Sequence, residues 1–253
     1  MILAAVVIAA AVEAAAPRDE LLAAMNRLQT ARTYRMKMGD QLIEYQNPEP
    51  RLRIVGKTTV SGFDATRETI VVGKQMASRI ISPELEAYIA KLKATKRMSE
   101  LISIGSSIRS AMQSIAFGPY GWLSALSAAR SAASAAREAG KPEPLEHYFK
   151  WECVELPYPI TPQKNSEPDP SLRVTRIATD NTGLTEYHST TTFQGGNGTP
   201  MTMNSRNWID ANGFPRKSEL SFGGDDPPVV MEYSDFDAAD IKIEPPKCET
   251  IQK

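Results

Sequence analysis

The sequence is poor in the residues and motifs on which most enzyme chemistry depends. Its 253 residues include only two cysteines and two histidines. It contains no G-x-S-x-G, H-E-x-x-H or C-x-x-C motif and no Walker loop. His147 and His188 each lack a second plausible ligand, which favours a surface or strand role over metal binding. We therefore expect no catalytic residues, no metal site and no cofactor, and we expect that the protein is not an enzyme.

An excess of charge of one sign is also absent. The 29 basic and 30 acidic residues give a formal net charge of -1. A nucleic-acid-binding domain usually needs a strongly basic face, so we expect no nucleic-acid partner. The remaining composition is that of an ordinary globular protein.

The N-terminal apolar run, residues 1–12, is too short to cross a bilayer comfortably and is typical of a signal peptide. Val12 and Ala14 provide small residues at the usual cleavage spacing. No Lys or Arg precedes Arg18, and the alternative is a buried N-terminal helix in a cytosolic protein. We expect residues 1–16 to be a signal peptide and residues 17–253 to form a single domain in the periplasm.

Cys153 and Cys248 are the only cysteines in the sequence. In an exported protein, they are expected to form a disulfide that joins the middle of the chain to its C-terminal part. The alternative is two unpaired thiols.

Hydrophobic periodicity predicts an α+β fold. Residues 17–32 have the apolar stripe of a helix, and Tyr34–Met38 alternates apolar and basic side chains as a half-buried strand does. Short strand patterns then recur, separated by Gly, Asn and Pro, which predicts an antiparallel meander. These patterns cover residues 51–54, 69–73, 172–178, 184–193, 207–209, 216–222 and 229–233. The Gly-rich run 195–198 is typical of a hairpin loop and not of a phosphate-binding loop, which would open a helix.

Residues 83–140 are predicted to form a helical insertion of two or three helices. Ser82 is placed to cap the first helix and Pro83 to occupy its first position. A second apolar stripe runs from Leu101 to Ile115, and the third helical segment covers residues 122–139. The insertion carries a basic cluster, which is either a solvated helix face or a contact with anionic headgroups. Its members are Lys91, Lys93, Lys96 and Arg97.

Three segments in the last third of the chain resemble the closing strands of periplasmic lipoprotein carriers of the LolA type. They are Trp208–Lys217, Val229–Asp237 and Ile241–Pro246. The first part of the chain resembles the same family in its helix, in Tyr34–Met38 and in residues 52–54 and 68–74. The resemblance covers about residues 17–80 and 170–247. It implies a curved antiparallel sheet, a half-open β-barrel, with an N-terminal helix and with the helical insertion as a lid.

The resemblance also implies an apolar cavity for acyl chains, and plain core packing is the alternative for each candidate lining residue. The candidates are Met36, Met38, Ile54, Ile104, Ile108, Met112, Trp208, Met231 and Tyr233. Two features depart from the family: Asn47 stands where the carriers have an arginine that latches the lid, and the insertion is longer.

The predicted function is that of a periplasmic carrier or chaperone that binds the acyl chains of a lipid or lipoprotein. Membrane-associated donor and acceptor proteins are the expected partners. The alternative is an interaction or sensor module on the same fold, with the helical insertion as the protein-binding surface.

Overall fold

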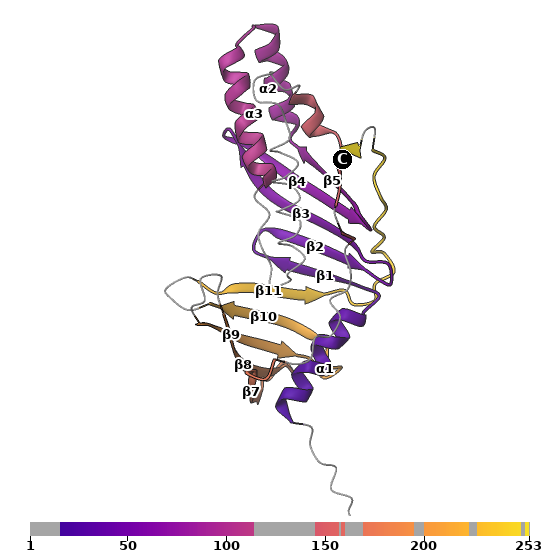
Figure 1. The fold of residues 1–253 in the computed structure, drawn as a ribbon, viewed down its shortest axis with the longest axis vertical. Helices are drawn as coiled ribbons and strands as arrows, with labels where there is room; N and C mark the ends of the chain where they lie inside the picture. Colours follow the sequence, from indigo (N-terminus) through magenta and orange to yellow (C-terminus); the bar gives the residue numbers. More distant parts are fainter. Residues whose placement is uncertain are drawn as a thin grey trace, which may run out of the picture. The chain divides into compact units, whose positions relative to one another are not determined.

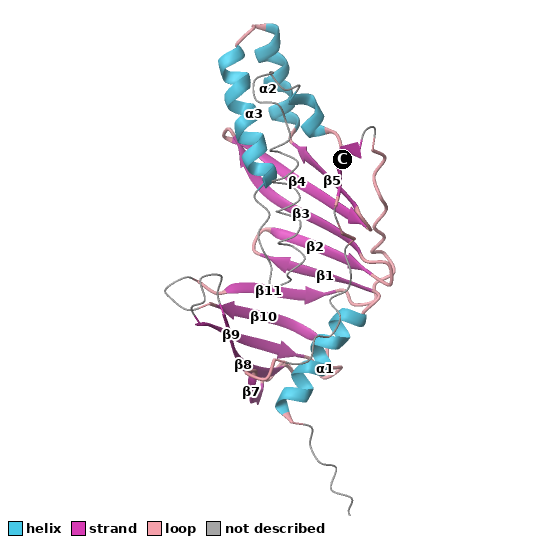
Figure 2. Ribbon diagram, viewed as in Figure 1, coloured by secondary structure: helices cyan, strands magenta, loops and turns pink. Residues whose placement is uncertain are grey.

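The computed structural model describes residues 16–113, 145–156, 158–159, 169–194, 200–222, 227–248 and 251–252. It divides into two compact units. The smaller unit takes in the chain up to Arg27 and residues Pro168–Pro228, and the larger unit takes in Leu28–Glu167 and Val229–Lys253. The chain is α+β, with antiparallel strands in an unclosed arrangement, an N-terminal helix and two inserted helices, as the sequence predicts (Figure 2). No described helix combines the length and the apolar character needed to span a membrane.

The larger unit is built on strands in the order β12-β6-β5-β4-β3-β2-β1-β11 (Figure 1). Their bounds are β1 Thr33–Met38, β2 Gln41–Gln46, β3 Arg51–Val60, β4 Phe63–Val72, β5 Gln75–Ile81, β6 Glu152–Glu155, β11 Val229–Ser234 and β12 Ile251–Gln252. Neighbouring strands pair antiparallel except for β12, which pairs parallel with β6. The sheet of this unit therefore has two ends and does not close on itself.

Period-2 alternation gives this sheet two chemically different faces. In β3, Leu52 and Ile54 are buried, while Arg53 between them points to the opposite side. The register carries this alternation across the sheet, because Ile54 lies opposite Ile43 of β2 and Thr69 of β4. We call the side with Leu52 and Ile54 the apolar face and the side with Arg53 the charged face.

The two inserted helices follow β5 and form a hairpin, α2 (Pro83–Ala94) and α3 (Met98–Gln113). Pro83 begins α2 as predicted, but the Ser82 side chain does not cap it. The Ser82 hydroxyl instead donates to the carbonyl of Asp64, 2.7 Å away, and so joins the start of α2 to β4. The short 3-10 helix η1 (Leu145–Phe149) packs against the same end of the sheet. The predicted third helix, residues 122–139, lies outside the described residues.

The smaller unit has four antiparallel strands in the order β10-β9-β8-β7 and one helix, α1 (Pro17–Thr30), whose last residues belong to the larger unit. The strands are β7 Arg173–Thr179, β8 Thr185–Gln194, β9 Pro200–Ile209 and β10 Pro215–Ser221. Leu21 and Ala24 of α1 pack on Tyr187 and Ile209. The turn that joins β9 to β10 contains Gly213 with a φ of +77°, which a side chain would strain.

The segment after β11 is not a strand, although the resemblance counts Ile241–Pro246 among the closing strands. It runs without strand pairing to Cys248, and we call residues 235–248 the strap. Its two prolines, Pro245 and Pro246, have no N–H to donate to a ladder. Ile241 and Ile243 are nevertheless buried, because they pack on Ile70 of the charged face.

Candidate functional site

The apolar face gathers the largest group of predicted ligand-cavity residues. It takes Met36 and Met38 from β1, Ile54 from β3, and Met231 and Tyr233 from β11. All five side chains are buried. The register sets Met38 directly opposite Met231 and Met36 directly opposite Tyr233. Side chains from separate parts of the sequence are thus brought together on one buried apolar face.

Methionine and tyrosine give this surface its character. Methionine is unbranched and polarizable, so it adapts to irregular apolar shapes. The Tyr34 ring stacks on Tyr45 with a centroid distance of 5.1 Å, and the Tyr233 hydroxyl donates to the Met231 sulfur at 3.6 Å. Burial raises the pKa of Tyr34 far above its usual value, and the neighbouring Tyr45 and Tyr233 raise it further. Burial also raises the pKa of Tyr45, so both of these phenols stay neutral at physiological pH.

The three candidates in the insertion lie together in a second cluster. Ile104, Ile108 and Met112 are buried on the inner side of α3, against Val60 of β3 and Ile80 of β5. Leu85, Ile89 and Leu92 of α2 and Tyr148 of η1 complete this cluster. Each of these side chains is less than 10% exposed. The hairpin is therefore attached to the sheet through a well-filled apolar core.

One charged side chain lies within the apolar face and contacts this hairpin. Arg67 of β4 is only 4% exposed, and it donates to the Ala111 carbonyl of α3 at 3.0 Å. Gly56 lies directly opposite Arg67 in β3 and has no side chain of its own to contact it. Burial lowers the pKa of Arg67 from its usual value. A helix C-terminus carries partial negative charge, which suits the guanidinium.

Trp208 is not among the side chains of these two clusters. It belongs to β9 of the smaller unit, where its ring lies beside two cations. The Lys217 ammonium is 4.7 Å and the Arg206 guanidinium 5.8 Å from the ring centroid. Asn47, which the resemblance compares with a latch arginine, donates to the carbonyls of Gln29 and Ala31, each at 2.9 Å. It therefore holds the end of α1 and not a lid.

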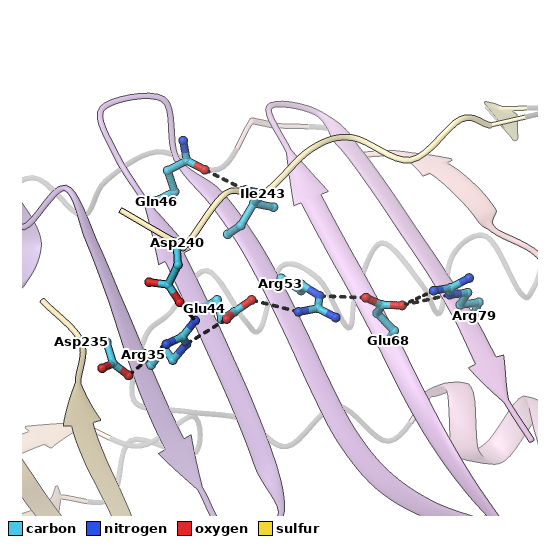
Figure 3. A network of polar contacts seen from close by, with 9 residues as sticks. All are labelled: Arg35, Glu44, Gln46, Arg53, Glu68, Arg79, Asp235, Asp240 and Ile243. Atoms are coloured by element: carbon cyan, nitrogen blue, oxygen red, sulfur yellow. Dashed lines mark hydrogen bonds and ion pairs between the residues drawn. The ribbon is translucent and has the colours of Figure 1, made fainter. Parts of the chain in front are cut away.

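The charged face carries a ladder of alternating ion pairs, one side chain from each of the strands β1 to β5 (Figure 3). We call it the charge ladder, and its members are Arg35, Glu44, Arg53, Glu68 and Arg79. Glu44 accepts from Arg35 at 2.9 Å and from Arg53 at 3.0 Å. Glu68 accepts from Arg53 at 2.8 Å and from Arg79 at 2.7 Å. Each carboxylate thus joins two strands that are not its own.

The ladder shifts the pKa values of Arg35, Arg53 and Glu68. Burial by itself would raise the pKa of Glu68, but the hydrogen bonds and charges of Arg53 and Arg79 hold it below its usual value. The pKa of Arg35 is raised by its bonds to Asp240 and Glu44. At the far end, the Arg79 guanidinium lies 4.4 Å from the centre of the Trp151 ring. The shifts of Arg35, Arg53 and Glu68 therefore favour the ionised form of each of these three groups.

The strap crosses the same face and contacts the ladder. Asp235 and Asp240 both accept from Arg35. The backbone of Ile243 is held on both sides, since its N–H donates to Gln46 and its carbonyl accepts from Arg51 (Figure 3). At the end of the strap, Cys248 forms a disulfide with Cys153 of β6, which confirms the predicted pair.

The histidines of the described residues do not belong to a metal cluster. No group of three or more potential His, Cys, Asp or Glu ligands comes together in this part of the chain. His188 hydrogen-bonds to Glu186 at 2.6 Å, and the His147 ring lies beside Tyr148. A pocket of about 390 Å³ opens near the β3–β4 turn, with Lys57, Asp64 and Thr66 among its lining residues. Its lining mixes these polar side chains with the apolar Ala65, Ile81 and Pro83, and it is separate from the cluster of predicted cavity residues.

The charge ladder and Arg67 were not identified from the sequence. The signal in the sequence is a charged residue between two apolar ones within a strand, such as Arg35 in β1 and Arg53 in β3. That signal becomes specific only when the strand register is known.

No protein-family model matches the sequence, and a search of curated proteins finds no relative.

Proposed function

We propose that the protein is a periplasmic carrier or chaperone that binds acyl chains of a lipid or lipoprotein on its apolar face, without covalent chemistry. The observation that carries the proposal is the alignment of Met36, Met38, Ile54, Met231 and Tyr233 on one face of an unclosed sheet. A sheet that curves into a half-open barrel presents such a face to a ligand, and the methionines adapt to flexible chains.

In this proposal the α2–α3 hairpin is the lid, fixed at one end of the apolar face. The bond from Arg67 to the Ala111 carbonyl supports this role, since it joins the end of α3 to the sheet. The apolar run 1–12 and the Cys153–Cys248 disulfide support an exported, oxidising location. The resemblance to LolA-type carriers supports the class of ligand.

A second candidate is an interaction or sensor module, and the cluster under α3 favours it. Ile104, Ile108 and Met112 fill the space between the helix and the sheet with their own side chains. A filled core at this position leaves the outer surface of the hairpin as its functional part. The two candidates differ in whether the apolar face takes up an acyl chain.

The test is the binding of a fluorescent fatty acid to the full chain, with Met38→Trp as the variant. The larger side chain occupies the apolar face, so we expect affinity to fall about tenfold, or ~1.4 kcal/mol. Lys37→Trp is the matched control, because Lys37 is the adjacent β1 residue, is exposed and points to the charged face. Its affinity should remain that of the unmodified protein.

Two further measurements keep this test decisive if Met38→Trp folds poorly. A photoactivatable fatty acid should label peptides that contain Tyr34–Met38 or Val229–Ser234 in the unmodified protein. Native mass spectrometry of protein isolated from the periplasm should show added lipid mass. A uniformly ligand-free mass together with no uptake of the probe would overturn the carrier and favour the interaction module.

A further inference from the structure

The turn between α2 and α3 has a defined backbone and lies at the end of the hairpin away from the sheet (Figure 1). Lys96 adopts a φ of +55°, which ends α2 abruptly. The N–H of Arg97 then bonds to the Leu92 carbonyl and that of Lys96 to the Lys93 carbonyl. These backbone bonds close the helix end, so the turn is a defined structure. We call residues 91–102 the hairpin tip.

The hairpin tip is strongly basic. It carries four basic side chains, Lys91, Lys93, Lys96 and Arg97, against the single acid Glu100, a net charge of +3. Lys93 pairs with Glu146, and Arg97 pairs with Glu100. Lys91 and Lys96 form no ion pair with any residue that the structure describes, and both are exposed. Their charges face solvent.

The other two acids of the hairpin lie at its opposite end. Glu84 and Glu86 occupy the first turn of α2, next to the sheet. The charge of α2 is therefore polarised along its axis, with the positive end at the tip. Such an arrangement orients the hairpin end-on toward a negatively charged surface.

Two large apolar side chains lie exposed beside these charges. Met98 is 49% exposed and Ile102 is 64% exposed. They are four residues apart on α3 and so share one face, which borders the stripe of the buried Leu101 and Ile104. One turn further along, the same face carries Ser106, which is polar. The exposed apolar surface of α3 is thus confined to the tip.

We infer that the hairpin tip docks end-on to a bilayer that contains anionic phospholipid. Met98 and Ile102 enter the interface between headgroups and acyl chains, while Lys91 and Lys96 bind lipid phosphates. Two apolar side chains bury too little area for a stable protein interface, which takes about 800 Å² from each partner, but they suit shallow insertion. The long lysine side chains reach the headgroups while their methylenes lie along the apolar region. This inference is independent of acyl-chain carriage, because the tip shares no residue with the apolar face.

The test is co-sedimentation of the full chain with vesicles of equimolar phosphatidylglycerol and phosphatidylcholine, compared with vesicles of phosphatidylcholine alone. We expect binding to the mixed vesicles only, and weaker binding as salt is added. Lys91→Gln and Lys96→Gln should each lower the partition coefficient about fivefold. Ile102→Ser removes the inserted side chain and should lower it about tenfold.

The controls are matched substitutions in the same unit. Lys57→Gln removes an exposed lysine of β3, and Ile81→Ser removes an isoleucine of β5 that is 40% exposed. Neither should change vesicle binding, and circular dichroism checks that every variant is folded. Equal binding to both kinds of vesicle, or unchanged binding of Lys96→Gln and Ile102→Ser, would overturn the inference. Met38→Trp should dock normally, so a failure of carriage and a failure of docking are distinguished.

Discussion

The two faces of the larger sheet use alternate residues of the same strands for different purposes. On the apolar face, Met36 and Ile54 are buried among other apolar side chains. On the charged face, Arg35 and Arg53 bind carboxylates from neighbouring strands. Burial on the first face is non-directional, whereas the hydrogen bonds of the second have fixed geometry. The strands of this unclosed sheet are therefore joined by directional ion pairs on one side and by apolar burial on the other.

The largest expected effect compares adjacent residues of β3 on opposite faces. Ile54→Ala leaves a cavity in the apolar face and should reduce the free energy of unfolding by ~3 kcal/mol. Val55→Ala, on the charged face and half-buried, should cost less than ~1.5 kcal/mol. Urea denaturation measures both variants. Equal losses would show that the two faces do not differ in packing.

A smaller effect is expected from the centre of the charge ladder. Glu68→Gln removes the charge that Arg53 and Arg79 share, and should reduce the free energy of unfolding by ~2 kcal/mol. Glu49→Gln is the control, because Glu49 also pairs with an arginine, Arg51, but its side chain is 82% exposed. That pair should contribute less than ~0.5 kcal/mol. If both variants lose the same amount, the ladder stabilises the fold no more than a surface pair does.

The smallest effect is a dependence of stability on pH. Because the pKa of Glu68 is lower in the folded protein than in the unfolded chain, its ionised form favours folding. This contribution is present above the ordinary glutamate pKa of about 4.3 and is lost as the pH falls through the lower, folded value. Thermal melts between neutral and acidic pH should therefore show a steeper decline for the unmodified protein than for Glu68→Gln. If the melting temperatures of both proteins fall equally with pH, the acid sensitivity comes from other carboxylates.

Patterns of period 2 and 3.6 were sufficient to predict much of this architecture. The alternation in Tyr34–Met38 predicted β1, and the spacing of Leu101, Ile104 and Ile108 predicted α3. The strand β2 was not predicted, because Leu42, exposed, and Ile43, buried, are adjacent and give no simple alternation. Sequence periodicity reports one strand at a time, so it reveals a strand best when only one of its faces is apolar.

The candidate site was harder to predict, because it depends on which strands pair and in which register. The five apolar-face candidates come from three strands, and only the pairing of β1 with β11 brings Met38 to Met231. No local sequence pattern predicted that Arg67 is buried, because it stands between Thr66 and Glu68 like a surface arginine. Its burial follows from Gly56 across the pair and from the carbonyl of α3, neither of which is near it in sequence.

The disulfide has a topological consequence. Together with the chain from Cys153 to Cys248, it closes a covalent ring that contains all of β7, β8, β9 and β10. If those strands lose their structure, β11 remains tethered to β6 through the short span from Ser234 to Cys248, and not only through the long span from Glu155 to Val229. A shorter tether lowers the entropic cost of returning β11 to its place beside β1. The ring therefore favours the pairing of β11 in the larger unit whether or not β7 to β10 keep their structure.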